Sequence, residues 1–259
     1  MVMVHGFGVS GVTWRPITPL LAGSFRCHAI DLPGHGRSHA PSAFNFTLEE
    51  HVAALQEYVI DSDLENVVLV GHSLGGTIST LSLIIGSEDY RRRIAALCII
   101  DGVCYPIALP FFLWIPRVPI IGELAIDCIP AEVQVTRTIR ACFFDHSKID
   151  ERQVRDYARD LKNADVRHAI LQTAKNIDQV RLQAYVERIR DIRKPALLIW
   201  GRNDNFVPLL HGKRLNRDLT NSELVVLDRC GHMPQEERPE QTAYSILRAR
   251  VLSSHRAMR

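Results

Sequence analysis

Short runs of Val, Ile and Leu alternate along much of the chain with segments in which apolar residues recur every three or four positions. The runs are typical of strands buried on both faces, and the segments are typical of helices that cover a sheet. The pattern predicts strands at residues 2–4, 25–30, 67–70, 94–100, 196–200 and 224–227. We therefore expect an α/β fold with a mostly parallel central sheet and helices on both faces.

Two helices have clear boundary signals. Thr47 and Glu50 form a T-x-x-E capping box ahead of an apolar stripe, which predicts a helix that begins after Thr47. Near the end of the chain, Pro239 suits a first helical position, and Ala243 and Ile246 recur on one face. We expect both helices to pack on the sheet.

Residues 104–194 break the alternation of strands and helices. The segment opens with a Pro-rich apolar stretch and continues with amphipathic helical patterns, without an obvious strand. Its interspersed charges are typical of a solvated face. We therefore expect a helical insertion at 104–194 that divides the core into residues 1–103 and 195–259.

Composition and charge exclude several classes of protein. Of the 259 residues, 46% are hydrophobic and 23% are charged, which is enough apolar material for a sizeable core. The net charge of +2 is too small for the basic field that nucleic-acid binding needs. No apolar run approaches the roughly 20 residues of a membrane-spanning helix. We expect neither a nucleic-acid partner nor a transmembrane segment.

The cysteines and the first residues bear on location. The six cysteines contain no C-x-x-C pair, which favours buried free thiols in a reducing compartment. The start of the chain lacks a basic segment followed by an apolar run and a small-residue cleavage site. We expect a cytoplasmic protein. The sequence leaves open whether it forms a homodimer.

The strongest chemical signal is Gly71-His-Ser-Leu-Gly75, a G-x-S-x-G sequence between an apolar strand and a helical stretch. In this context the serine lies on a sharp strand-to-helix turn, and the flanking glycines avoid collisions across it. The turn exposes Ser73 Oγ at the edge of the sheet, beside the amide donors of a helix N-terminus. Ser73 is therefore the candidate nucleophile.

A serine hydroxyl needs a base, and the base usually needs an orienting carboxylate. One predicted strand runs into a polar loop with Asp204, and the last strand runs into a loop with His232. The chain order serine, aspartate, histidine is that of G-x-S-x-G hydrolases. Asp101, at the end of the strand at 94–100, is the competing acid; its alternative role is hydrogen bonding at the entry to the insertion.

Acyl transfer also needs two N–H donors for the oxyanion of the tetrahedral intermediate. Leu74, directly after the candidate nucleophile, should supply one through its backbone. Phe7 should supply the other from the glycine-containing loop after the first strand, where the backbone can approach closely. Such a site needs no metal ion and no cofactor.

Together these segments resemble the α/β-hydrolase superfamily, in the form of a serine hydrolase with a helical cap. The resemblance spans nearly the whole chain in family order, through His5-Gly-Phe-Gly8, Asp31-Leu-Pro-Gly-His-Gly-Arg-Ser38, Gly71-His-Ser-Leu-Gly-Gly76, Gly201-Arg-Asn-Asp204 and Gly231-His232. It implies that Asp31, His35 and Ser38 shape a loop near the site and are structural.

The N-terminus departs from the family pattern. In that family two strands usually precede the His-Gly loop, whereas only Met1 to Val4 precede His5 here. We therefore expect the N-terminal edge strands to be missing, either because the protein lacks an antiparallel edge hairpin or because the start codon was assigned too far downstream. Their loss would uncover the edge of the strand that carries the oxyanion loop.

A serine at the elbow favours an acyl-enzyme over the alkyl-ester route of the related aspartate enzymes. The main hypothesis is a carboxylesterase for small to medium hydrophobic esters. The alternatives are a carbon–carbon hydrolase of meta-cleavage products, a cofactor-free perhydrolase and, outside enzymes, a ligand-binding receptor that reuses the fold. The residues expected to line the substrate pocket are His72, Phe111, Phe112 and Trp114, although aromatic residues of the insertion can equally pack it onto the core.

Overall fold

The computed structural model describes residues 1–108, 110–118, 120–249 and 252. Six strands in this part of the chain form one sheet in the order β2-β1-β3-β4-β5-β6, and each neighbouring pair is parallel. Their bounds are β1 (Val2–Val4), β2 (His28–Ile30), β3 (Val67–His72), β4 (Ile94–Ile100), β5 (Ala196–Gly201) and β6 (Ser222–Leu227). The predicted α/β class with a parallel sheet is confirmed.

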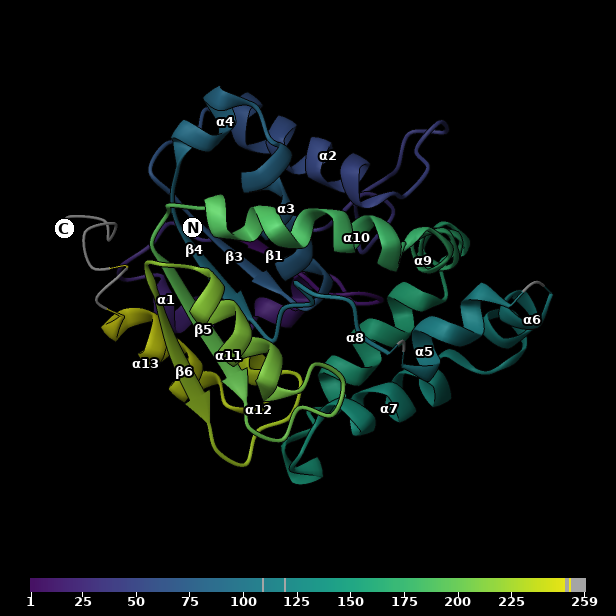
Figure 1. The fold of residues 1–259 in the computed structure, drawn as a ribbon. Coiled ribbons are helices and arrows are strands. Elements are labelled where there is room, and N and C mark those ends of the chain that lie inside the picture. The colour runs from purple at the N-terminus through teal and green to yellow at the C-terminus, as the bar shows by residue number, and fades with distance from the viewer. Residues whose placement is uncertain (109, 119, 250–251, 253–259) are drawn as a thin grey trace.

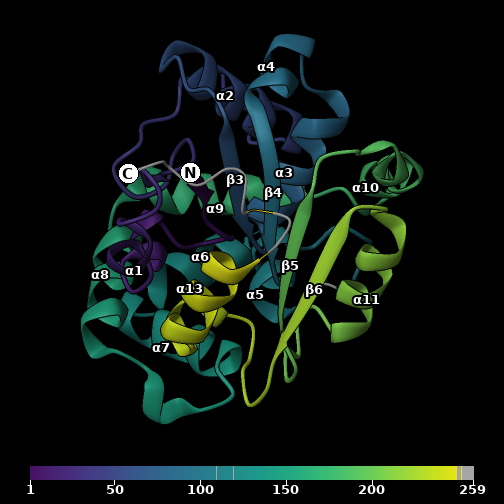
Figure 2. The same ribbon diagram turned by 90° about the vertical axis from the view of Figure 1, so that its left-hand side faces the viewer.

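Helices cover both faces of this sheet (Figures 1 and 2). Neighbouring residues of a strand point to opposite faces, so that Leu69 belongs to one apolar cluster and Val70 to the other. The Leu69 cluster includes residues of α2 (Leu48–Asp61), α3 (Leu74–Ile85) and α11 (Leu209–Asp218), and the Val70 cluster includes residues of η1 (Gly11–Trp14), α1 (Thr18–Leu21) and α13 (Pro239–Arg248). None of the described helices is long and apolar enough to cross a membrane.

The two helix boundaries predicted from the sequence are confirmed. Thr47 Oγ1 accepts a hydrogen bond from Glu50 N over 3.2 Å, and Glu50 Oε2 accepts one from Thr47 N over 3.4 Å. This capping box starts α2 at Leu48. Pro239 is the first residue of α13.

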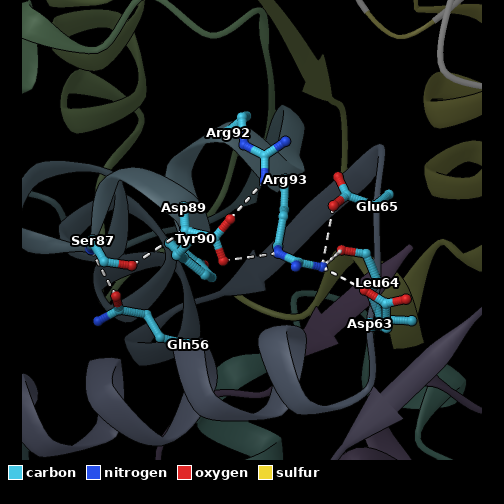
Figure 3. Close-up of polar contacts among 9 residues, drawn as sticks. All are labelled: Gln56, Asp63, Leu64, Glu65, Ser87, Asp89, Tyr90, Arg92 and Arg93. Carbon is cyan, nitrogen blue, oxygen red and sulfur yellow. Dashed lines mark hydrogen bonds and ion pairs between the residues drawn. The ribbon is translucent and has the colours of Figure 1, made fainter.

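Arg93 fixes the end of the sheet that lies away from the candidate site (Figure 3). It ends α4 (Glu88–Arg93), directly before β4, and its guanidinium lies 3.2 Å from Asp89, 3.0 Å from Asp63 and 3.2 Å from Glu65. Asp63 and Glu65 belong to the loop between α2 and β3. The arginine therefore ties together the starts of β3 and β4, the strands that lead to Ser73 and Asp101.

Most of the helical insertion lies beyond the carboxyl ends of the strands (Figure 1). Every described element between β4 and β5 is a helix, as the sequence predicts. These elements are α5 (Phe111–Trp114), η2 (Ile115–Arg117), α6 (Ile121–Cys128), α7 (Ala131–Cys142), η3 (His146–Lys148), α8 (Glu151–Leu161), α9 (Ala164–Asn176), α10 (Gln179–Val186) and η4 (Glu187–Asp191). The part from α5 to α9 lies beyond the strand ends, whereas α10 and η4 run back along α3 (Figure 1).

The position of β1 corrects one expectation. Val2 pairs with His28 of β2 on one side and with Leu69 of β3 on the other, so the edge of β1 is covered. After β1 the chain passes through η1 and α1 and returns as β2, which becomes the edge strand. The strand predicted at 25–30 also starts later, at His28, because Phe25 is buried in the apolar cluster of α1 and α13 without joining the ladder.

Candidate active site

Ser73 lies at the turn between β3 and α3 in a strained backbone conformation. Its φ of 53° and ψ of −116° lie outside the regions that non-glycine residues favour. The neighbouring glycines are required, because a Cβ at Gly71 would lie 2.4 Å from Gly75 O and a Cβ at Gly75 would lie 2.2 Å from Val4 O. Ser73 N donates to Ile100 O over 3.0 Å, which holds the turn against β4.

The structure brings Ser73, His232 and Asp204 together. His232 Nε2 lies 3.0 Å from Ser73 Oγ, and His232 Nδ1 lies 2.7 Å from Asp204 Oδ2. Asp204 Oδ1 accepts hydrogen bonds from Phe206 N and Val207 N, so the carboxylate is fixed at both oxygens. Because Nδ1 donates to Asp204, Nε2 presents its lone pair to the hydroxyl. This geometry suits removal of the Ser73 proton.

Close backbone contact joins the two loops that carry Asp204 and His232. Gly201 ends β5, and a Cβ there would lie 1.9 Å from Gly231 O. Asn203 N donates to Cys230 O over 2.9 Å. Glycine at position 201 therefore allows the approach that places the aspartate beside the histidine.

Asp101 lies behind Asp204. It is fully buried with a φ of 44°, and its Oδ1 accepts a hydrogen bond from Gly201 N over 3.0 Å. Burial and the charge of Asp204 raise the pKa of Asp101 well above its usual range, which favours the neutral form of this acid. His232 Nδ1 donates its hydrogen bond to Asp204 and not to Asp101. Asp101 instead accepts from Gly201 N at the end of β5 and so stabilises the loop that carries Asp204.

Asp101, Asp204 and His232 also form a set of donors close enough for a metal ion. One donor atom of each lies within 4.8 Å of the others, and no other group of His, Cys, Asp and Glu side chains in the described ranges does so. The hydrogen bond between His232 Nδ1 and Asp204 already uses two of these donors.

The predicted oxyanion donors lie in segments that contact the turn. Leu74 is the first residue of α3. A Cβ at Gly6 would lie 3.2 Å from Ser73 Cβ and 2.9 Å from His72 Nδ1, so the loop before Phe7 runs directly against the turn. The structure thus brings the Phe7 loop and Leu74 to Ser73, and donation from their backbones stays a prediction.

Two apolar cavities lie between the core and the helical insertion. The first, of about 80 Å³, is lined by Ser73 and His232 among others. The second, of about 260 Å³, is lined mainly by residues of the insertion and on the core side by residues 7–9. The walls of both cavities include four residues, Phe7, Val9, Thr138 and Ile139. Most of the free volume is therefore in the insertion, next to the space in front of Ser73.

The predicted pocket residues have three different outcomes. His72 lines the first cavity and Phe111 lines the second. The prediction for Trp114 is wrong, because this side chain is 59% exposed and lines neither of these two cavities. Its neighbour Leu113 is buried and lines the first cavity, so α5 turns Trp114 outward, and an apolar run cannot indicate which side faces inward. The side chain of Phe112 lies outside the described part of the structure.

Hydrogen bonds within the Asp31–Ser38 segment agree with the structural role expected of it. Asp31 Oδ1 accepts from Gly11 N over 2.7 Å, and Oδ2 accepts from Arg37 N over 3.0 Å. His35 Nδ1 donates to Pro33 O, and Ser38 N donates to His35 O. Asp31 therefore joins this loop to the start of η1.

Sequence reasoning missed two buried carboxylates just after His232. Glu236 accepts hydrogen bonds from the hydroxyls of Thr13 and Tyr157, and burial raises its pKa to about 7. Glu237 accepts from Gly231 N and from two backbone amides of the insertion. In the sequence, two adjacent glutamates beside Arg238 have the appearance of a solvated turn, and no signal in the sequence indicates that both are buried.

Comparisons with known proteins agree with this fold. The sequence model of the Alpha/beta hydrolase family matches residues 1–243. The chain is 31% identical over 240 residues to the uncharacterized hydrolase YugF of Bacillus subtilis (strain 168), covering 93% of this chain and 85% of that protein. It is 26% identical to the pimeloyl-[acyl-carrier protein] methyl ester esterase of Vibrio atlanticus (strain LGP32), covering 90% of this chain and 87% of that protein.

A solved structure with 26% sequence identity is that of 2-hydroxy-6-oxo-6-phenylhexa-2,4-dienoate hydrolase from Rhodococcus sp. strain RHA1. It matches with a TM-score of 0.79 and covers 98% of this chain and 89% of that one. The similarity therefore extends over the sheet and the helical insertion together.

Proposed function

Because the chain belongs to the alpha/beta hydrolase family, we propose that it is a serine hydrolase with Ser73 as nucleophile, His232 as base and Asp204 as the orienting acid. The observation that carries the proposal is the continuous hydrogen-bond chain from Ser73 Oγ through His232 to Asp204, with distances of 3.0 and 2.7 Å. A strained serine beside a correctly oriented histidine is the arrangement that nucleophilic acyl transfer requires.

In the proposed reaction, His232 Nε2 takes the Ser73 proton as Oγ attacks the carbonyl carbon. Asp204 stabilises the imidazolium, and the backbone amides of Phe7 and Leu74 donate to the oxyanion. The imidazolium then protonates the leaving group. Water, deprotonated by His232, hydrolyses the acyl-enzyme and restores the serine.

The apolar cavities support a carboxylesterase for small to medium hydrophobic esters. Residues of the insertion, such as Leu113 and Ile139, form much of the wall in front of Ser73. We therefore assign the insertion at 104–194 the role of a cap on the core formed by residues 1–103 and 195–259. The relative from Vibrio atlanticus is named a methyl ester esterase, which is compatible with this assignment.

Carbon–carbon hydrolysis is the second candidate, and the relative from Rhodococcus favours it. The compound in that enzyme's name contains no ester, so its hydrolysis must break a carbon–carbon bond. A substrate of this type carries a carboxylate, and Arg137 lines the second cavity. In the described part of the chain Arg137 has no ion pair, whereas Gln134, Thr138 and Tyr157 in the same wall have hydrogen-bond partners. Arg137 is therefore the group that suits the carboxylate.

The test compares two substrate types with purified protein. Wild type, Ser73→Ala and Ser79→Ala are assayed with p-nitrophenyl esters of increasing acyl length and with a 2-hydroxy-6-oxo-dienoate. Ser79 is the control because it is a buried serine of α3 whose hydroxyl has no partner among the described residues. Ester turnover that disappears only in Ser73→Ala supports the esterase. Turnover of the dienoate alone supports the second candidate, and no turnover by folded wild type contradicts both.

A further inference from the structure

Glu237 is a buried carboxylate that no step of the proposed reaction uses. It is 1% exposed and ends α12 (Pro234–Glu237). Its Oε2 accepts from Gly231 N over 2.7 Å and from Phe144 N over 3.2 Å, and its Oε1 accepts from Asp145 N over 2.7 Å. Burial of a carboxylate is unfavourable unless several donors meet it, and here the donors come from two separate segments.

These two segments are the loop of the catalytic histidine and the end of α7. Gly231 directly precedes His232, and Phe144 and Asp145 follow α7. His232 N donates to Cys142 O over 2.7 Å, and a Cβ at Gly231 would lie 2.1 Å from the same oxygen. The two segments are therefore in direct backbone contact, and Glu237 holds both.

The same helix reaches the substrate cavity. Thr138, Ile139 and Cys142 of α7 line the cavity in front of Ser73. The last of these residues accepts the backbone hydrogen bond of His232. A helix that forms the cavity wall thus ends at the contact that Glu237 fixes.

We propose that Glu237 is a positioning residue that holds the His232 loop against the end of α7. The catalytic base thereby keeps its position relative to the cavity wall that α7 forms. It acts through Gly231 and touches neither Ser73 nor substrate. The inference rests on the proposed function, since it assigns His232 the role of base. Loss of the Glu237 acceptors releases the His232 loop from the insertion and moves Nε2 away from Ser73 Oγ.

Glu236 provides a matched control. It is also buried, and it also joins the core to the insertion, because its carboxylate accepts from Thr13 of η1 and from Tyr157 of α8. Gly231 N donates to Glu237 and not to Glu236, so loss of Glu236 removes a buried carboxylate and an anchor of the insertion without releasing the His232 loop. Effects seen at Glu237 and not at Glu236 therefore report the position of His232.

The experiment measures kcat and KM for a p-nitrophenyl ester with Glu237→Gln, Glu237→Met, Glu236→Gln and Glu236→Met, at a temperature well below the unfolding of each. We expect Glu237→Met to lower kcat about tenfold or more with KM changed less than about threefold, because misplacement of the base affects the chemical step. Glu237→Gln should lie between this variant and wild type, since its NH2 group cannot accept from an amide. Both Glu236 variants should keep kcat within about threefold of wild type.

Crystal structures of the same variants give a measurement that needs no turnover. The separation of His232 Nε2 and Ser73 Oγ should lengthen in Glu237→Met and stay near 3.0 Å in Glu236→Met. Equal kcat in the two methionine variants, or an unchanged separation in Glu237→Met, overturns the inference. If wild type hydrolyses neither an ester nor the dienoate, the proposed function fails and the separation still tests the role of Glu237. If Glu237→Met does not fold, kcat of Glu237→Gln and the separation of His232 Nε2 and Ser73 Oγ in its crystal structure test the inference instead.

Discussion

His72 donates a hydrogen bond from Nε2 to the backbone carbonyl of His232 over 2.7 Å. The residue before the candidate nucleophile thus holds the residue proposed as its base. Burial lowers the pKa of His72 to about 3, so the ring is neutral at neutral pH and carries its proton on Nε2. The His232 loop is therefore held at two places, by His72 at the turn of the candidate nucleophile and by Glu237 at the end of α7.

Removal of this donor should affect stability as well as turnover. In His72→Leu the carbonyl of His232 stays buried without its donor, which should lower the free energy of unfolding by about 1–3 kcal/mol. Urea denaturation measures the change, and kcat should fall in the same variant. His72→Gln, which can donate through its amide, should lose less of both. Equal losses in the two variants would show that the hydrogen bond is not the cause.

The buried histidines predict loss of stability in acid. Burial lowers the pKa of His5 to about 4 and that of His35, His51 and His72 to about 3. In the unfolded chain each of these histidines takes up a proton near pH 6.5. In the folded protein each histidine takes up its proton only near its own lowered pKa. Stability should therefore be independent of these groups above about pH 6.5 and fall below it, by about 1.4 kcal/mol per pH unit for each histidine.

Urea denaturation at a series of pH values from about 7 to about 5 measures this slope. His51→Leu is the informative variant, because neither ring nitrogen of His51 has a hydrogen-bond partner among the described residues. We expect the slope of its stability against pH to be smaller by the contribution of one histidine. Its stability at neutral pH should be at least that of wild type. A slope identical to that of wild type would mean that His51 takes up its proton over the same pH range in the folded and the unfolded protein.

The raised pKa of Asp101 leads us to expect opposite outcomes for the two aspartates. Asparagine has the shape of the neutral acid, accepts from Gly201 N through its oxygen and offers N–H donors on the side of Asp204. Asp101→Asn should therefore keep kcat within about threefold of wild type, whereas Asp204→Asn should lower it about a thousandfold or more. Steady-state kinetics with one ester substrate measure kcat of both variants against wild type. A large loss in Asp101→Asn would show that Asp101 works as a carboxylate.

The backbone of Ser73 predicts a stabilising substitution at the candidate nucleophile. Glycine accepts a φ of 53° without strain, so Ser73→Gly should be more stable than Ser73→Ala by about 1 kcal/mol. Both variants lose the hydroxyl, and the difference therefore isolates the backbone. At Ser79, inside α3, the order should reverse, with glycine about 1 kcal/mol less stable than alanine. Thermal or urea denaturation of the four variants tests both signs.

The sequence alone determined the features that depend on local chemistry. Apolar runs bounded by polar loops predicted the strands, because a strand buried on both faces needs such a run wherever it pairs. Gly71 and Gly75 identified the turn at Ser73 because no other residue fits there, and the loops after two later strands supplied Asp204 and His232. Parallel strands end at one edge of a sheet, so the meeting of these residues followed from the pattern.

Only the tertiary structure decided the features that depend on segments far apart in the chain. The place of β2 beside β1, the outward side of Trp114 and the raised pKa of Asp101 each follow from which surfaces meet. Hydrophobic periodicity carries no such information. Glu237 is the clearest case, since in the sequence it is one of two adjacent glutamates. Its role follows from three backbone amides that lie 6, 92 and 93 residues away along the chain.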